Sequence, residues 1–405
     1  MNLEQQIANI VTGQMVEEMI QIRRRFHQYP ELSFQEHRTS ELIRKILDQW
    51  EIEYTFPHVG TGIVARIRGD HPGKRIALRS DMDALPITEQ TNLPYASENS
   101  GIMHACGHDM HMASLLGVIR VLKQLKHEMN GEVLFLFQPG EELIPGGARL
   151  MLEEGVFEGR KPDLIIAQHV LPEMEAGHVG FRPGIYMASS DEIYITVKGR
   201  GGHGALRQHV RDPILMASHI LISLQDTINR MAPENIPTVL SFGKVVADGA
   251  VNVIPDDVFL EGTFRTMNED WRKEAHRLIG EVCTDVSSRM GGSVIVDIRN
   301  GYPVLRNNEQ IATESKKLAV KLLGSRNVED MDIRMTAEDF AWFTQEIPGM
   351  MYRLGVKEPG ADKPSPLHSP LFRVSESALR TGISVMAYLA LELLKMTLIK
   401  NKNGE

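Results

Sequence analysis

The chain has 405 residues, of which 42% are hydrophobic and 24% are charged, as in an ordinary globular protein. This length exceeds what one compact core usually supports, so we expect two domains. The formal net charge of −9 provides no attraction for phosphate groups, which argues against a nucleic-acid or anionic-membrane partner.

The number of cysteines and the length of the apolar runs indicate the cellular compartment in which we expect the protein. Cys106 and Cys283 are the only two cysteines, too few for a disulfide framework and typical of a reducing compartment. The start of the chain lacks a basic region followed by an apolar core, and no apolar run approaches membrane-spanning length. We therefore expect a cytoplasmic protein without a membrane partner.

The N-terminal part of the chain alternates helical and strand patterns. The spacing predicts a helix from Met15 to Gln28, and Ser33 with Glu36 resembles a capping box that opens a second helix. A further helical pattern covers residues 113–126. Strand-like runs cover residues 63–67, 75–79, 132–137 and 163–167. This alternation predicts an α/β fold in which helices flank a central sheet.

The order of elements changes near residue 188. Ile193, Ile195 and Val197 alternate with polar residues, as in a strand with one solvated face, and Asp212-Pro213 opens a helix. Two strands, a helix and a last strand follow, over residues 238–246, 258–264, 268–290 and 293–298. The order β-α-β-β-α-β is the ferredoxin-like arrangement.

We therefore predict that residues 189–302 form a domain inserted into a first domain, which consists of residues 1–188 and 303–405. The first domain resumes after the insertion with three predicted helices, near residues 309–323, 337–346 and 375–398.

Residues 104–111, HACGHDMH, place three imidazoles, a thiol and a carboxylate within eight positions. Such ligands suit a transition metal such as Zn, Mn, Co or Ni. Cys106 and His108 can face one ion only if the backbone between them is irregular or extended, a freedom that Gly107 supplies. Taken alone, the cluster also fits a solvated loop or a structural zinc clip. A structural zinc site, however, needs four ligands, and no second cysteine is nearby.

Other metal-type residues follow predicted strands. Strands 75–79, 132–137 and 163–167 run into Asp81 and Asp83, into Glu141 and Glu142, and into His169, respectively. Catalytic groups of open α/β sheets lie beyond the carboxyl ends of strands, and two adjacent carboxylates can divide metal binding from proton transfer. Each residue alone has a simpler explanation, such as a solvated turn. His368, between two prolines in a loop, is equally weak alone, so the argument depends on the whole set.

The ordered motifs resemble those of one enzyme family. These motifs are DMDALP, HACGHD, QPGEE, GRGGHGA, NVIPD, GTFRT, AEDFAWF and LHSPLF, together with His169. They are similar to the metal-dependent amidohydrolases of the aminoacylase/carboxypeptidase clan, in the branch of hippurate hydrolases, N-acetyldiaminopimelate deacetylases and auxin-conjugate hydrolases. The resemblance extends from about residue 20 to 395. It implies a di-metal peptidase-like catalytic domain and an inserted lid and dimerisation domain.

The resemblance also implies a function and its residues. It implies cleavage of the amide bond of N-acyl amino acids, with two divalent cations (Zn, Mn, Ni or Co) per subunit and Glu141 as the general base. The implied metal ligands are Cys106, His108, Glu142, His169 and His368. Asp83 would support the ligands rather than bind metal.

The inserted domain carries the remaining implied residues. His203 would act in catalysis, commonly in the site of a partner subunit, so a homodimer or higher homo-oligomer is implied. Asn252 and Arg265 would contact the substrate, although a strand arginine can equally serve a surface ion pair. One position departs from the family: its Pro-His pair is replaced by Arg207 and Gln208. A histidine follows one place later, at residue 209, and we do not transfer the family role to it.

Three alternatives stay open. A dipeptidase or carboxypeptidase would use the same two metal ions and the same base, and only the substrate pocket would differ. Asp81 after an apolar strand also resembles the aspartyl nucleophile of Mg-dependent phosphatases, but that hypothesis leaves the cysteine, the glutamate pair and the histidines unexplained. A non-catalytic metal-binding protein is the third alternative, and it would have no use for Glu141.

Overall fold

The computed structural model describes residues 1–397, and the chain forms two compact units. Among the described residues, the first unit contains Met1–Tyr186, Arg306–Asp332 and residues 339–397. The second unit contains Met187–Leu305 and Ile333–Glu338. The short segment 333–338 therefore lies in the second unit, although it follows the predicted insertion in the sequence.

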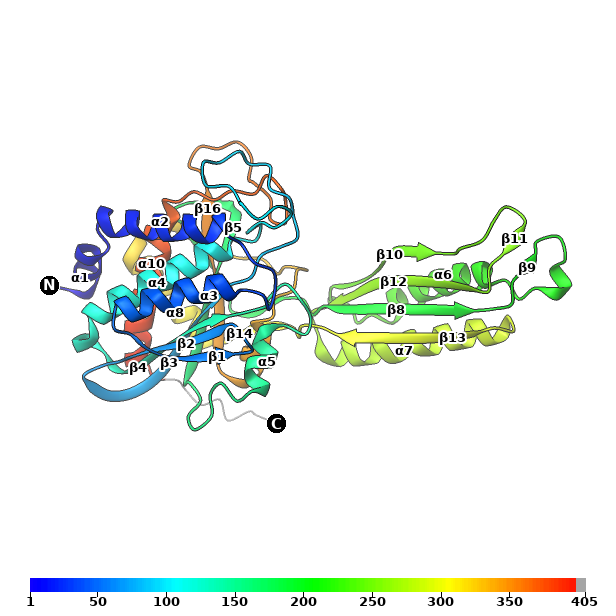
Figure 1. The fold of residues 1–405 in the computed structure, drawn as a ribbon. Coiled ribbons are helices and arrows are strands. Elements are labelled where there is room, and N and C mark those ends of the chain that lie inside the picture. Colours follow the sequence, from blue (N-terminus) through cyan, green and yellow to red (C-terminus); the bar gives the residue numbers. More distant parts are fainter. Residues whose placement is uncertain (398–405) are drawn as a thin grey trace. The chain divides into compact units, whose positions relative to one another are not determined.

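The first unit is built on an eight-stranded sheet with the order β1-β2-β4-β3-β5-β16-β6-β15. Figure 1 labels β1 to β5 and β16 of this sheet. Its strands are β1 (Glu53–His58), β2 (Gly62–Arg68), β3 (His71–Asp81), β4 (Asn130–Gln138), β5 (Leu164–Glu175), β6 (Val179–Phe181), β15 (Val328–Asp330) and β16 (Gly349–Lys357). The four central strands, β4, β3, β5 and β16, pair in parallel. Most residues of these strands are buried, apart from the first part of β3, as expected for parallel strands covered on both faces.

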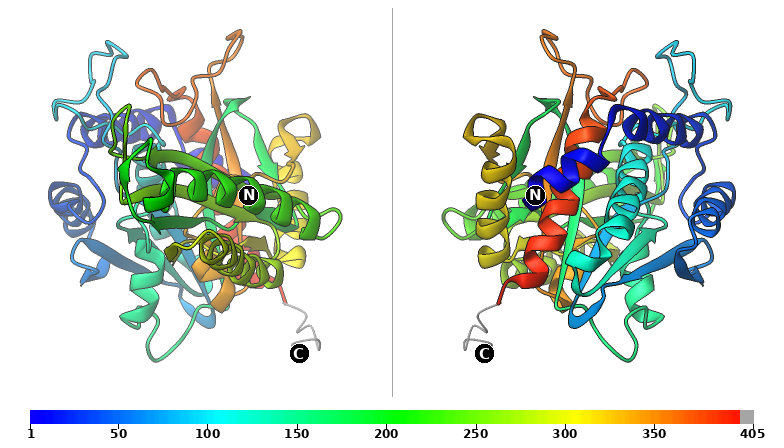
Figure 2. Two further views of the ribbon diagram at one scale, coloured as in Figure 1. Left: turned by 90° about the vertical axis from the view of Figure 1, so that its right-hand side faces the viewer. Right: turned by 90° about the vertical axis from the view of Figure 1, so that its left-hand side faces the viewer.

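Helices cover this sheet. They are α1 (Leu3–Ile10), α2 (Gly13–Gln28), α3 (His37–Gln49), α4 (His108–Gln124), α5 (Gly147–Glu153), α8 (Glu309–Leu323), α9 (Ala341–Glu346) and α10 (Ala378–Lys395). Helix α10 lies between α4 and α8 (Figure 2). Both α4 and α10 are buried on almost all sides, because each packs against the sheet and against neighbouring helices.

The second unit is an antiparallel four-stranded sheet with the order β10-β12-β8-β13. Its strands are β8 (Asp191–Lys198), β10 (Thr238–Val246), β12 (Asp257–Thr266) and β13 (Ser293–Asn300). Helices α6 (Pro213–Met231) and α7 (Glu269–Arg289) share one apolar core with the inward-facing residues of this sheet. The element order is the predicted β-α-β-β-α-β, and the α/β fold class is confirmed.

Short elements complete the chain. The strands β7 (Gly184–Met187) and β14 (Leu305–Asn307) pair with each other, as do β9 (Gly202–His203) and β11 (Val253–Ile254). The 3-10 helices are η1 (Lys126–Glu128), η2 (Arg207–His209) and η3 (Ser325–Asn327). Within residues 1–397, no helix is both long enough and apolar enough to cross a bilayer.

Several predicted boundaries are wrong. Helix α4 begins at His108 rather than at 113, and α9 begins only at Ala341. Strand β5 does not end at Ala167 but continues to Glu175, because β16 pairs with it along this length. Helix α10 ends at Lys395, and residue 398 of the predicted helix lies outside the described residues.

The predicted capping box at Ser33 and Glu36 is also wrong. Helix α3 begins at His37, and its N-cap residue Glu36 makes no side-chain capping bond. The hydroxyl of Ser33 instead donates to Asp83, and the carboxylate of Glu36 accepts hydrogen bonds from other segments. The first turn of α3 is capped by Glu31, which accepts from the backbone of Arg38 and Thr39.

Candidate metal centre

The ends of the parallel strands place most of the predicted site residues at one edge of the first unit. Asp81 pairs with Gln138 at the ends of β3 and β4, so the loop with Glu141 and Glu142 begins beside Asp81. The pairing of β3 with β5 ends at Ala167. His169 lies two positions further along β5, where β3 no longer covers it. The sequence predicted that these residues lie at one edge of the sheet. His169 does so because β3 ends beside β5 at this point, and not because β5 itself ends there.

The cluster HACGHD leads into the first turn of α4. Gly107 has φ of +83°, a left-handed conformation that favours glycine. A Cβ at this position would lie 2.6 Å from the side chain of Val170. The tight backbone turns Cys106 and His108 toward a common point despite their spacing of two residues. Both side chains are buried.

The structure brings the five predicted ligands together. The Cys106 Sγ lies 3.5 Å from His169 Nε2, and Glu142 Oε1 lies 3.8 Å from His108 Nε2 and 3.4 Å from His368 Nε2. Within residues 1–397, five groups of residues have donor atoms within 4.8 Å of one another, and three of these groups include at least two of the predicted ligands: Cys106, His108 and His169; Cys106, Glu142 and His368; and His108, Glu141 and Glu142. These three groups share members, so they form one continuous cluster, which we call the candidate metal centre.

Hydrogen bonds orient two of the imidazoles. His108 Nδ1 lies 2.9 Å from the backbone oxygen of Asp83, and His169 Nδ1 lies 2.8 Å from the backbone oxygen of Val170. A carbonyl oxygen can only accept, so each Nδ1 carries the proton and donates it. In the neutral ring each Nε2 then has a lone pair directed at the centre, and a bound cation would favour this form, which is the tautomer a metal ligand requires.

Two buried atoms of the centre have no hydrogen-bond partner in the described part of the chain. These atoms are His108 Nε2 and Glu142 Oε1. An unsatisfied buried polar group costs about 1–3 kcal/mol, so two of them facing each other indicate a missing electrophilic partner. Sulfur, nitrogen and carboxylate donors together fit divalent transition-metal ions. The cluster therefore suits two metal ions, as predicted.

The electrostatics of the centre favour a cation. Burial and the carboxylates of Glu142 and Glu141 raise the pKa of the Cys106 thiol well above its usual range. Burial alone would lower the pKa of His108, but the carboxylates of Asp81 and Asp83 outweigh it and raise the pKa to about 10. The cluster thus concentrates negative charge that a bound cation would neutralise.

Asp83 lies beside the centre, and its supporting role stays a prediction. Its Oδ2 accepts hydrogen bonds from the Ser33 hydroxyl at 2.7 Å and from the Glu142 backbone N–H at 2.9 Å. Its Oδ1 lies 3.3 Å from His108 Nδ1. Asp83 therefore links the His108 ring to the backbone of Glu142.

Asp81 is held away from any substrate. Its carboxylate is fully buried and lies 2.6 Å from both Arg79 Nη1 and His111 Nδ1. His111 Nε2 accepts from the backbone N–H of Val170 at 3.0 Å, so both ring nitrogens of His111 are occupied. An aspartyl nucleophile must reach a phosphate, which argues against the phosphatase alternative.

A second buried network beside the centre was not predicted. Asp109 Oδ2 lies 2.7 Å from Arg23 Nε and 2.8 Å from His27 Nδ1, which ties the first turn of α4 to α2. The signal in the sequence was Arg23 and His27 within the helical pattern of residues 15–28, where both are buried. His104, the remaining histidine of the segment 104–111, is also buried, and burial lowers its pKa to about 3.

His203, Asn252 and Arg265 lie in the second unit. His203 pairs with Val253 between β9 and β11, so it lies beside Asn252, and its side chain is exposed. Arg265 in β12 is partly buried and donates to the backbone oxygen of Met335 at 3.2 Å. The roles of these three residues stay predictions.

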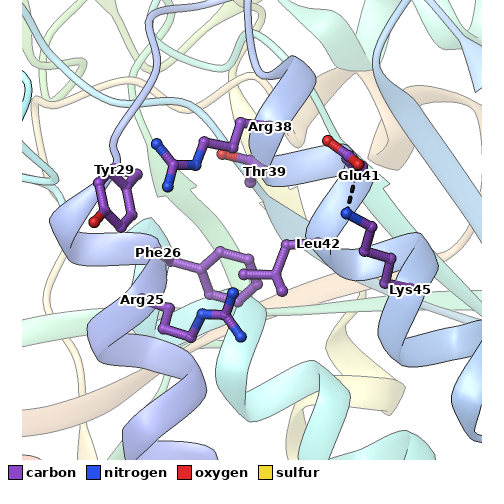
Figure 3. Close-up of a pocket in the computed structure, with 8 residues that line it drawn as sticks. All are labelled: Arg25, Phe26, Tyr29, Arg38, Thr39, Glu41, Leu42 and Lys45. Carbon is purple, nitrogen blue, oxygen red and sulfur yellow. Dashed lines mark ion pairs between the residues drawn. The ribbon is translucent and has the colours of Figure 1, made fainter.

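A pocket elsewhere on the first unit contains none of the predicted site residues (Figure 3). It has a volume of about 200 Å³ and lies between α2 and α3. The guanidinium of Arg38 lies 3.4 Å from the centre of the Tyr29 ring, and Glu41 pairs with Lys45. The basic groups that line this pocket are therefore already engaged within the protein or exposed to solvent.

Known proteins resemble this chain over most of its length. Residues 77–392 match peptidase family M20/M25/M40. An N-acetylcysteine deacetylase of Bacillus subtilis is 37% identical over 378 residues, which cover 93% of this chain and 97% of that protein. An IAA-amino acid hydrolase of Arabidopsis thaliana is 36% identical, covering 96% of this chain and 89% of that protein.

A solved structure agrees with these sequence matches. The crystal structure of a dinuclear metal-binding peptidase of the M20 family from Bacillus subtilis superposes with a TM-score of 0.80 at 34% identity. The superposition covers 95% of this chain and 99% of the other. The chain therefore belongs to peptidase family M20/M25/M40, which confirms the relationship predicted from its motifs.

Proposed function

We propose that the protein is a metal-dependent amidohydrolase that cleaves the amide bond of N-acyl amino acids or related amino-acid conjugates. The observation that carries the proposal is the pair of unsatisfied buried atoms, His108 Nε2 and Glu142 Oε1, with Glu141 beside them. Relatives named as acyl-amino-acid hydrolases support the same reaction class.

The proposed ligands of two divalent cations are Cys106, His108, Glu142, His169 and His368. Zn, Mn, Ni and Co all suit these mixed donors. Bound cations would lower the pKa of water and stabilise the oxyanion of the tetrahedral intermediate. The expected cytoplasmic location belongs to the same proposal, because a thiol ligand must stay reduced.

Glu141 moves the proton in this mechanism. Its carboxylate is almost fully buried, and Oε1 accepts from the backbone N–H of Asp339 at 3.4 Å. It accepts a proton from the attacking water and returns it to the leaving amine, so one group serves both steps. A buried carboxylate held by the backbone is suited to this task because it cannot swing out to solvent.

Acylated amino acids are expected to be better substrates than dipeptides. The measurement is kcat/KM of metal-reconstituted protein for acetyl, benzoyl and longer acyl amino acids beside simple dipeptides, with metal-free protein as the control. Higher kcat/KM for dipeptides would support the peptidase alternative. Hydrolysis of neither class would contradict the proposed function.

The proposal includes a homodimer in which His203 serves the partner's site. Strand β10 is an edge strand of its sheet, and its Val245 side chain is 55% exposed. On the same unit, Ile222 of α6 is 62% exposed. Unpaired strand edges and exposed apolar side chains are typical of surfaces that another chain covers.

Mixing two inactive variants tests this arrangement. Glu141→Gln and His203→Ala should each be inactive as homodimers. In a C2 dimer, refolding an equal mixture should restore about a quarter of wild-type activity, because half the dimers are mixed and each has one intact site. No recovery, or an active monomer by light scattering, would contradict a role for His203 across the interface.

A further inference from the structure

A buried carboxyl group, Glu36, connects three separate segments of the first unit. Its Oε1 accepts from the backbone N–H of Phe34 at 2.9 Å and of Gly140 at 2.8 Å, and its Oε2 accepts from the Thr61 hydroxyl at 2.7 Å. The side chain is fully buried. Burial and the neighbouring Asp83 raise the pKa of Glu36 to about 7.

The contact with Gly140 fixes the backbone directly before the glutamate pair. Gly140 has φ of +60°, and a Cβ there would lie 2.3 Å from the ring of Phe34. The ring thus packs on the glycine itself. Phe34 also has a positive φ, 64°, which is unusual for a bulky residue, and its N–H bond to Glu36 helps hold it there.

The same segment anchors the other side of Glu141. The Ser33 hydroxyl donates to Asp83 Oδ2, the atom that also accepts the Glu142 backbone N–H. The backbone amides on either side of Glu141 are therefore both held by carboxylates linked to residues 33–36. Glu141 itself gains a defined position between two anchored amides.

We propose that Glu36 is a positioning residue that holds the loop of Gly140, Glu141 and Glu142, so that Glu141 reaches the attacking water. The proposal rests on the proposed function for its catalytic consequence. A misplacement of about 1 Å at a reacting group can cost about 100-fold in rate. None of the other four proposed ligands lies on this loop, so metal binding should largely survive a shift of the loop.

Three variants test the proposal. Glu36→Ala removes the acceptor and should lower kcat by about 10- to 100-fold, with KM and metal content changed by no more than a few-fold. Glu36→Gln keeps an oxygen for both backbone donors, and its amide can donate to the Thr61 hydroxyl, so kcat should recover to within a few-fold of wild type. Gly140→Ala places a methyl group against the Phe34 ring. This should displace the Gly140 backbone from Glu36 and reproduce the loss of kcat.

Glu31→Ala is the matched control. Glu31 also accepts three hydrogen bonds, but all come from Arg38 and Thr39 in α3. This variant should lower thermal stability without lowering kcat. Equal losses of kcat in Glu31→Ala and Glu36→Ala, or wild-type kcat in Glu36→Ala, would overturn the positioning role. If Glu36→Ala does not fold, the kcat of Gly140→Ala becomes the test. Wild-type kcat in Gly140→Ala would also overturn the positioning role of Glu36.

Hydrogen exchange of the segment 139–146 provides a readout that does not require activity. The Gly140 amide should exchange at least about 10-fold faster in Glu36→Ala than in wild type or Glu31→Ala. Unchanged exchange would contradict the positioning role. Faster exchange in a protein that hydrolyses no acyl amino acid would support the positioning role while contradicting the proposed function.

Discussion

Replacing Glu141 with Gln is expected to leave bound metal in place and to lower kcat by about 100- to 10,000-fold, the usual contribution of a general base. The side chain keeps its shape and can still accept from the Asp339 backbone N–H. It loses only the basicity needed to take a proton from water. Steady-state kinetics and elemental analysis of the same samples measure both effects.

Two controls sharpen the Glu141 experiment. Glu153→Gln changes an exposed glutamate of α5 that pairs with Arg149 and should have wild-type activity. Glu142→Gln weakens a proposed ligand and should lower metal content. Full activity in Glu141→Gln would show that the base is assigned wrongly, and loss of metal in this variant would make Glu141 a ligand.

Replacing Cys106 with Ala is expected to lower metal affinity by at least about 10-fold, because even groups that only support ligands contribute 10- to 100-fold. The thiol lies in two of the three donor groups of the candidate metal centre. Its removal takes away the sulfur atom that lies 3.5 Å from His169 Nε2. Elemental analysis after dialysis against a weak chelator measures the change.

The second cysteine provides the control for this experiment. Cys283 is buried in the apolar core of the second unit. Cys283→Ala should lower stability by about 1–3 kcal/mol through the cavity that it leaves, without changing metal content. Unchanged metal content in Cys106→Ala would refute the thiol as a ligand.

The fold and the spatial proximity of the predicted site residues could largely be predicted from the sequence, for one physical reason. Parallel strands end at the same edge of a sheet, so Asp83, Glu142 and His169 could be placed together from the ends of apolar runs. The two-residue spacing of Cys106 and His108 likewise predicted an irregular or extended backbone between them, and the structure has a left-handed conformation at Gly107.

Contacts between distant segments were not predictable. Ser33 and Glu36 have the spacing of a helix cap, but their side chains bond to Asp83, Thr61 and Gly140 instead. These partners lie 25, 50 and 104 residues away in the sequence, and local spacing carries no information about them. The extension of β5 beyond Ala167 has the same origin, because it depends on pairing with β16.

The most direct test of the candidate metal centre is a crystal structure of protein reconstituted with Zn or Mn, with the ions located by anomalous scattering. The proposal predicts two ions per subunit within coordination distance of Cys106, His108, Glu142, His169 and His368, with Glu141 beside them and not bound. A single ion, or ions held by other side chains, would contradict it.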